Sequence, residues 1–106
     1  MTRDPAKGQI GGVAVEVTYV ERLGRERTRV HFHKSVAVTC ILDGCARLIV
    51  SGGRPREQCA VAGGPPNCYM MPSYRVIQNE NTLNKTLKLL DIFVLTPDEE
   101  RFYPLE

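Results

Sequence analysis

Residues 27–44 read RTRVHFHKSVAVTCILDG and contain both histidines of the chain. His31 and His33 are two residues apart, so in a strand their imidazoles lie on one face. The same period puts Arg27 and Arg29 on that face. This stretch therefore predicts a strand with a polar face that carries two imidazoles and two guanidinium groups.

Short strands separated by turn residues are predicted on both sides of this stretch. The apolar run 36–42 ends at Asp43-Gly44, a strong turn signal. Alternating β-branched residues and flanking Gly, Pro, Asn and Asp predict strands at 13–19, 25–33, 36–42, 45–50, 58–62, 68–71, 76–79 and 87–95. No long amphipathic helix pattern is present. The sequence therefore predicts an all-β sandwich or closed barrel.

The two ends of the chain are expected to lie outside the barrel. Residues 1–9 are polar and predict a loose arm. Thr96-Pro97, with Glu99 three residues after Thr96, predicts a short helical turn near the C-terminus, which a short tail follows. Without a repeat, a linker or a low-complexity segment, the chain is predicted to be a single domain over 1–106, with the barrel at about 12–95.

Composition narrows the functional classes. The net charge is only +2, and no basic run is interleaved with aromatic residues, so nucleic-acid binding is not expected. No apolar run approaches the roughly 20 residues that span a bilayer, so no membrane partner is expected. No stretch resembles a signal peptide, which predicts a cytoplasmic location.

The four cysteines are interpreted as free thiols. They are Cys40, Cys45, Cys59 and Cys68. No C-x-x-C pair occurs among them, so a zinc knuckle is not predicted. In a protein without a secretory context they are expected to be small, mostly buried core residues.

The chain resembles the cupin superfamily of small jelly-roll barrels. The resemblance lies in His31-x-His33 with Gly44 after it, and in the strand 63–71 followed by Pro72 and Asn81. It covers about 12–95 and implies a single jelly-roll, or double-stranded β-helix, barrel. Cupins often form homodimers by pairing edge strands, and the resemblance implies this role for residues 13–19.

The resemblance also implies a metal site, but one whose motif is incomplete. Cupin sites use three His and one Glu to hold iron, manganese, nickel or zinc. Here Ala37 stands at the Glu position and Ile77 at the position of the third His. Only His31 and His33 of the four ligands are present, and neither replacement has a lone pair to donate.

Without a metal, the same residues suit acid–base chemistry. His31 and His33 are the predicted catalytic residues, because imidazoles exchange protons near neutral pH. Arg29 and Arg27 are expected to bind a carboxylate or phosphate, and Asn79 and Tyr69 are the further predicted substrate-binding residues. Metal-free cupins that act as dehydratases, isomerases or cyclases are known, so the prediction is cofactor-independent proton transfer on a small, polar, anionic metabolite.

Two alternatives remain open at this point. One is a metal-dependent enzyme in which His31 and His33, with non-standard ligands, bind a divalent transition metal. The other is a ligand-binding or sensor module without catalytic activity. Asp91 interrupts the apolar run 87–95, and if buried it needs a partner, for which Arg29 is a candidate.

Overall fold

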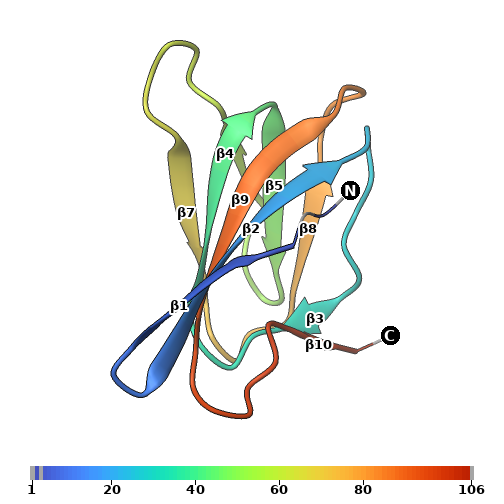
Figure 1. Ribbon diagram of the computed structural model, residues 1–106. Coiled ribbons are helices and arrows are strands. Elements are labelled where there is room, and N and C mark those ends of the chain that lie inside the picture. Colours follow the sequence, from blue (N-terminus) through green and yellow to red (C-terminus); the bar gives the residue numbers. More distant parts are fainter. Residues whose placement is uncertain (1, 3, 106) are drawn as a thin grey trace.

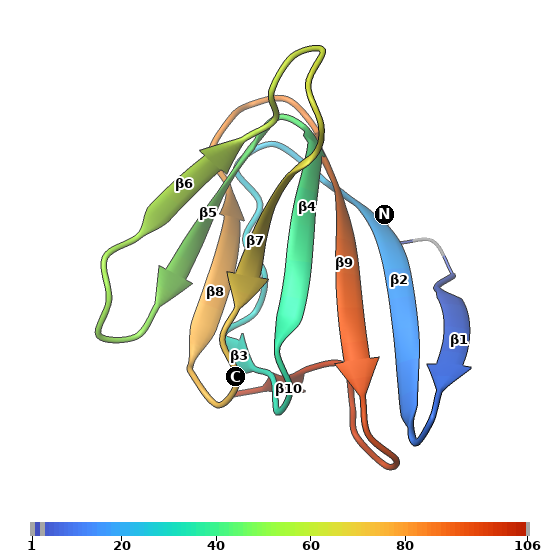
Figure 2. The ribbon, with the colours of Figure 1, turned by 90° about the vertical axis from the view of Figure 1, so that its left-hand side faces the viewer.

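The computed structural model describes residues 2 and 4–105, which form two antiparallel β-sheets. The strands are β1 (Ala6–Ile10), β2 (Val13–Arg22), β3 (His31–Phe32), β4 (Ala37–Asp43), β5 (Cys45–Val50), β6 (Arg56–Cys59), β7 (Asn67–Met71), β8 (Ile77–Asn81), β9 (Leu87–Leu95) and β10 (Tyr103–Pro104). The first sheet has the order β1-β2-β9-β4-β7 and the second the order β10-β3-β8-β5-β6, and the two face each other (Figures 1 and 2). The predicted all-β fold is confirmed. Within the described residues, no helix is long and apolar enough to cross a membrane.

The space between the sheets holds the core and, beside it, a polar region. Ile41, Ile77 and Leu87 are each at most 1% exposed and belong to one apolar cluster. Alternate side chains of a strand point to the same face. Along β9 the inward-facing side chains are therefore first Leu87 and Leu89 and then Asp91. The inward face of β4 likewise carries Thr39, which is 2% exposed. The functional site is expected where the buried side chains become polar.

The predicted N-terminal arm is wrong, because these residues form β1. This strand pairs with β2 from Ala6 opposite Val17 to Ile10 opposite Val13. Gly11, with φ +61°, begins the two-residue turn between them, which glycine permits. Because β2 pairs with β1 on one side and β9 on the other, residues 13–19 are not an edge strand, and the edge-pairing role predicted for them is wrong.

The predicted strand at 25–33 is interrupted. Arg25 has φ +64°, and only a single bridge, from Arg27 to Glu80, precedes the two-residue strand β3. The chain bends again at Val30. A period of two therefore does not run from Arg27 to the histidines, and the prediction that Arg27 shares their face is wrong.

The predicted helical turn near the C-terminus is a β-turn. The N–H of Glu99 donates to the carbonyl of Thr96 at 3.2 Å, and the Thr96 hydroxyl donates to the Glu99 carboxylate at 2.6 Å. Asp98, with φ +65°, does not continue a right-handed helix. After the turn, β10 pairs with β3, so the tail becomes part of the second sheet.

The interpretation of the cysteines as free thiols is wrong, because all four form disulfides. Cys40 pairs with Cys68 and Cys45 with Cys59, each with a Cα–Cα distance of 4.0 Å. The members of each pair lie directly opposite each other on neighbouring strands. Linear spacing does not reveal such pairs, because they depend on strand register. Both disulfides point away from the core, one on the outer face of each sheet, since they alternate with buried residues.

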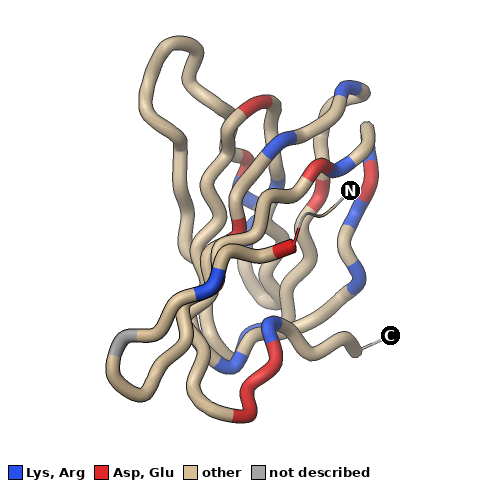
Figure 3. Tube along the Cα trace, in the orientation of Figure 1, with Lys and Arg blue, Asp and Glu red and all other residues tan. Residues whose placement is uncertain are grey.

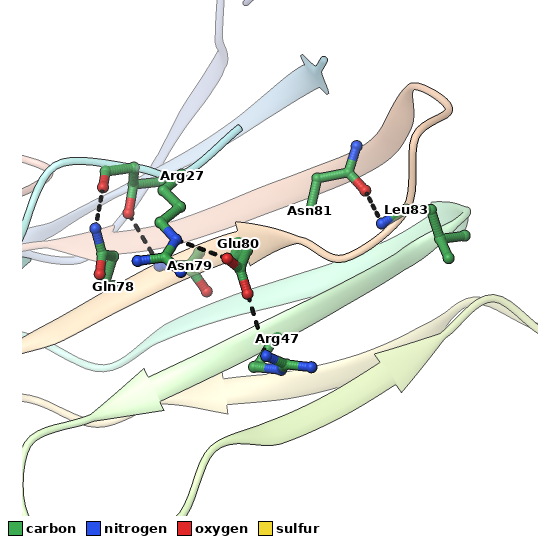
Figure 4. A network of polar contacts seen from close by, with 8 residues as sticks. Arg27, Arg47, Gln78, Asn79, Glu80, Asn81 and Leu83 are labelled. Atoms are coloured by element: carbon green, nitrogen blue, oxygen red, sulfur yellow. Dashed lines mark hydrogen bonds and ion pairs between the residues drawn. The ribbon is translucent and has the colours of Figure 1, made fainter. Parts of the chain in front are cut away.

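A buried asparagine holds the end of β2 in place. Asn81 is fully buried, and its Nδ2 donates to the carbonyls of Arg22, Leu23 and Lys85 at 3.1, 3.1 and 2.8 Å. Its Oδ1 accepts from the N–H of Leu83 at 3.0 Å (Figure 4). These bonds fix the position from which the side chain of Arg22 enters the site.

Candidate functional site

Two buried histidines face the interior from β3 and from the residue after it. His31 and His33 are 6% and 3% exposed, and their ring centroids lie 5.0 Å apart. The Nδ1 of His31 lies 2.5 Å from the carbonyl oxygen of Arg29, and that of His33 lies 2.6 Å from the carbonyl oxygen of Arg101. Since a carbonyl oxygen only accepts, each Nδ1–H donates and each Nε2 keeps its lone pair.

Burial lowers the pKa of both histidines. For His31, the hydrogen bond to the Arg29 carbonyl and the charge of Asp91 oppose the effect of burial, which is the larger. For His33, burial again outweighs the bond to the Arg101 carbonyl. Both imidazoles are therefore neutral at pH 7. The Nε2 of His33 is buried and has no hydrogen-bond partner among the residues described.

We expect both histidines to titrate below pH 6.5, their ordinary pKa, and to carry the proton on Nδ1 at pH 7. Unfolding then takes up protons, so the stability of the fold decreases as pH falls through 6.5 towards the lower pKa of the folded state. Long-range ¹H–¹⁵N NMR spectra of the imidazoles, recorded from about pH 8 to about pH 4, measure tautomer and midpoint. A proton on Nε2 at pH 7, or a midpoint above 6.5, contradicts this prediction.

The histidines line a cavity of about 430 Å³. Its walls come from both sheets and from the segment before β10. Met71, Phe93 and Phe102 provide apolar surface, and Phe102 packs edge-on against His31 with ring centroids 5.4 Å apart. Phe102 is 45% exposed, so the cavity reaches solvent beside it. A cavity of this size accommodates a small metabolite.

Three arginines from distant parts of the chain line the same cavity. They are Arg22 at the end of β2, Arg29 before β3 and Arg101 before β10. The Nε of Arg22 is buried, without a hydrogen-bond partner in the part of the chain that the structure describes. The Nη1 of Arg101 donates to the Thr18 hydroxyl at 3.4 Å. Guanidinium groups stay protonated and can pair with carboxylates or phosphates, and the Nε of Arg101 already lies 3.9 Å from Oε2 of Glu16.

The sequence predicted one of these three arginines. Arg29 was expected, and it does line the cavity. Arg22 follows Thr18 and Val20 at intervals of two along β2, so a correct assignment of the inward face would have identified it. Nothing in the sequence pointed to Arg101, because its position depends on the return of the tail to β3.

A buried carboxyl group lies beside the imidazoles. The hydroxyl of Thr39 donates to Oδ1 of Asp91 at 2.7 Å. Burial raises the pKa of Asp91, while the Thr39 bond and the charges of Arg22, His31 and Arg101 counteract the shift. The need for a partner, inferred from the sequence, is thus met first by a hydroxyl rather than by Arg29.

Asn79 and Tyr69 form a connected pair. Asn79 lines the cavity, and its Oδ1 accepts from the Tyr69 hydroxyl at 3.1 Å. Tyr69 itself borders a second cavity, of about 370 Å³, between β4, β5, β6 and β7. Burial raises the pKa of Tyr69 to about 12, so it stays protonated and donates. Asn79 and Tyr69 were both predicted to bind substrate. Asn79 borders the histidine cavity, and the hydroxyl of Tyr69 orients the side chain of Asn79.

Arg27 lies on the outer face of the second sheet. Its Nε is 2.6 Å from Oε2 of Glu80, whose other carboxylate oxygen is 3.3 Å from Nη1 of Arg47 (Figure 4). Arg27 does not belong to the described lining of the histidine cavity. The structure therefore separates it from the other predicted site residues.

The side chains present do not fit a metal centre of the four-ligand kind. No group of three or more His, Cys, Asp or Glu side chains among residues 2 and 4–105 is arranged to hold a metal ion. Ala37 and Ile77 are each 1% exposed and provide no donor atom. The cysteines are all engaged in disulfides.

Comparison with known proteins gives matches at the level of structure only. No family model and no curated protein matches the chain. A cupin 2 domain-containing protein from Halorhodospira halophila superposes with a TM-score of 0.69 at 22% identity, over 87% of this chain and 58% of that one. A sugar phosphate isomerase from a cupin superfamily, from Silicibacter pomeroyi, gives a TM-score of 0.64 at 14% identity, over 92% and 72% of the two chains.

A third solved structure is similar over most of this chain. It is the DMSP lyase DddQ from Ruegeria pomeroyi, with a TM-score of 0.61 at 21% identity, over 89% of this chain and 43% of the lyase. The chain therefore spans less than two thirds of the length of two of these three proteins. At these identities the likeness establishes the fold.

Proposed function

We propose that this chain, a domain of small cupin fold, is an enzyme that transfers a proton on a small anionic metabolite, with His31 and His33 as the acid–base pair and no metal cofactor. One observation carries the proposal. Both imidazoles donate from Nδ1 to backbone carbonyls, which leaves neither Nε2 with a proton, and both residues line one cavity. Neutral imidazoles are effective general bases near pH 7.

The reaction requires only the two imidazoles and a substrate with an acidic C–H bond. One Nε2 removes the proton next to a carbonyl group and becomes an imidazolium. Its proton then returns to a neighbouring atom in an isomerisation, or protonates a departing hydroxyl group, which leaves as water. Where an isomerisation also moves a hydroxyl proton, the second imidazole removes or returns that hydroxyl proton.

The charge of the cavity supports an anionic substrate. Arg22, Arg29 and Arg101 line it with His31 and His33, and carboxylates or phosphates form paired hydrogen bonds with guanidinium groups. Asn79 offers an amide for a hydroxyl or carbonyl group of the same ligand. Two proteins of similar fold are named as an isomerase and a lyase, which agrees with proton-transfer chemistry, although their substrates do not carry over at 14% and 21% identity.

Proton exchange in D₂O tests the proposal without knowledge of the substrate. The protein is incubated with a panel of small hydroxy acids, keto acids and sugar phosphates, and ¹H NMR follows the loss of each C–H signal. We expect at least one compound to exchange, or to be converted, at a rate at least about 10² above the buffer control. Binding of panel members without any exchange would favour a ligand-binding module and overturn the enzymatic proposal.

Metal dependence is the remaining alternative, because an Nε2 that carries no proton is a potential metal ligand. Elemental analysis after metal supplementation of untagged protein separates the two proposals. We expect a metal content far below one ion per chain, and exchange activity that survives a chelator. A stoichiometric metal ion, or activity lost to the chelator and restored by one metal, would replace the metal-free mechanism.

A further inference from the structure

The residues after β9 return to the strand that carries the histidines. We call residues 96–105 the C-terminal strap. The strap crosses from the first sheet, which contains β9, to the second, where β10 pairs with β3 (Figures 1 and 2). Its acidic stretch 98–100 lies in the loop between these two strands (Figure 3). The strap therefore spans one end of the sandwich, and two of its residues, Arg101 and Phe102, line the histidine cavity.

The strap holds the chain on both sides of the two histidines. Before them, the carbonyl of Val30 accepts a hydrogen bond from the N–H of Leu105 at 2.9 Å. After them, the hydroxyl of Ser35 donates to Oε1 of Glu99 at 3.0 Å. Among the residues described, β3 has only one paired position with its other neighbour, β8. The position of β3 therefore depends to a large extent on the strap.

Tyr103 is the central attachment of the strap. It lies opposite Phe32 in the pairing of β10 with β3, and the two rings stack with centroids 5.1 Å apart and 19° between their planes. The Lys34 ammonium over the same ring is exposed, so this cation–π contact is a weak one. The Tyr103 hydroxyl accepts from the N–H of Glu100 at 2.9 Å. Because Glu100 directly precedes Arg101, this bond helps to fix the main chain of Arg101.

The main chain of Arg101 determines which nitrogen of His33 carries the proton. Its carbonyl oxygen lies 2.6 Å from Nδ1 of His33 and accepts the proton of that nitrogen. The acceptor for His31 is the carbonyl of Arg29, which comes directly before β3 and not from the strap. An imidazole that donates from Nδ1 has an Nε2 without a proton, which is the form that can accept one. The strap therefore acts on one histidine of the pair and not on the other.

We propose that Tyr103 is a positioning residue, which holds the Arg101 carbonyl against Nδ1 of His33 and so keeps the Nε2 of that imidazole without a proton. The importance of this role for catalysis rests on the acid–base function proposed for His33. Arg101 then contributes twice to the site, because its main chain orients the imidazole and its guanidinium group lines the cavity. The strap is a part of the site rather than a dispensable tail.

NMR measurement of the imidazole ¹⁵N shifts at about pH 8 tests the proposal without a substrate. In the wild type, the protonated Nδ1 and the unprotonated Nε2 of His33 should have well-separated shifts. Tyr103→Ala removes both the ring and the hydroxyl group. It should reduce the separation by about half, because a released imidazole shares its proton between the two nitrogens. The separation for His31, which is bound to the Arg29 carbonyl, should stay within about a tenth of the wild-type value.

Three further variants separate the role of Tyr103 from other effects. The matched control is Tyr74→Ala, because the Tyr74 ring also stacks on Phe32, with centroids 6.3 Å apart, but does not belong to the strap. Arg101→Gln changes the side chain and retains the carbonyl. Both variants should leave the His33 shifts as in the wild type. Tyr103→Phe keeps the stacked ring and should restore most of the separation that Tyr103→Ala loses.

Wild-type His33 shifts in the Tyr103→Ala variant would overturn the proposal. Equal changes at His31 and His33, or an equal change in Tyr74→Ala, would do the same, because they indicate a general loosening of the fold. Circular dichroism checks that the variant is folded. If it is not, Tyr103→Leu replaces it, and the same shifts decide. Failure of the proposed function is distinguishable, since it appears as a lack of proton exchange in every panel compound, whereas the ¹⁵N shifts report the tautomer in either case.

Discussion

Replacing both histidines, as His31→Asn with His33→Asn, is expected to lower the rate of proton exchange by at least about 10². Asparagine keeps a donor near the place of Nδ1, which can still reach the carbonyls of Arg29 and Arg101, but it has no basic nitrogen. The loss therefore reports the missing base rather than a collapsed cavity. The measurement is the D₂O exchange rate of the most reactive compound of the panel, at saturating concentration.

The single variants assign the two roles. The variant that lacks the imidazole which removes and returns the C–H proton should lose nearly as much exchange as the double variant, whereas the other single variant should retain more of it. The matched control is Lys34→Gln, next to His33 in the chain but with its Nζ 4.6 Å from the centroid of the Tyr103 ring. Its rate should equal that of the wild type.

The pH profile provides a second readout of the same histidines. Burial lowers the pKa of both, so the basic form persists below pH 6.5 and the rate should decline only at lower pH. An exchange rate that the double variant leaves unchanged would remove the histidines from the mechanism, even if the cavity binds the substrate.

Reduction of the two disulfides is the change with the largest expected effect on stability. Cys45 and Cys59 close a loop with a separation of 14 residues, which corresponds to about 3 kcal/mol of unfolding free energy. Cys40 and Cys68 are 28 residues apart, and the loop that they close corresponds to about 3.5 kcal/mol of unfolding free energy. Together these are comparable with the whole stability of a small domain, about 5–15 kcal/mol.

Urea unfolding with and without a reducing agent measures this effect. We expect the midpoint to fall sharply on reduction, and Cys45→Ser with Cys59→Ser to give about half of the loss. The control is the oxidised wild type in the same buffer, with intact-mass analysis to count the hydrogens gained on reduction. Identical midpoints, or no mass gained, would mean that the cysteines are free thiols as the sequence suggested.

The same result bears on the predicted cytoplasmic location. Disulfides persist in oxidising compartments and are uncommon in a reducing cytosol. If reduction unfolds the chain, the stable form of the protein requires an oxidising environment. Comparing the yield of folded protein from oxidising and reducing expression hosts tests this dependence directly.

Much of the fold was predictable because local patterns specify strands. The strands at 45–50 and 87–95 coincide with β5 and β9, and Gly44, with φ +100°, bends the chain between β4, which ends at Asp43, and β5. The sequence also predicted that His31 and His33 share a face. It further showed that Ala37 and Ile77 provide no donor atom for a metal ion. These features depend on residue type and on spacing over a few positions, so they can be read from the chain alone.

The rest depended on contacts between residues distant in sequence. Arg22 and Arg101 meet the histidines only because β2 and the tail return to the same cavity, and the disulfides follow from strand register. Alternation along β2 indicated two faces but not which one is buried. In the structure the side chains of Thr18 and Arg22 line the cavity, and the side chain of Val17 lies on the outer face of the sheet. A period of two assigns side chains to a shared face, whereas the pairing of whole strands decides which face encloses the cavity.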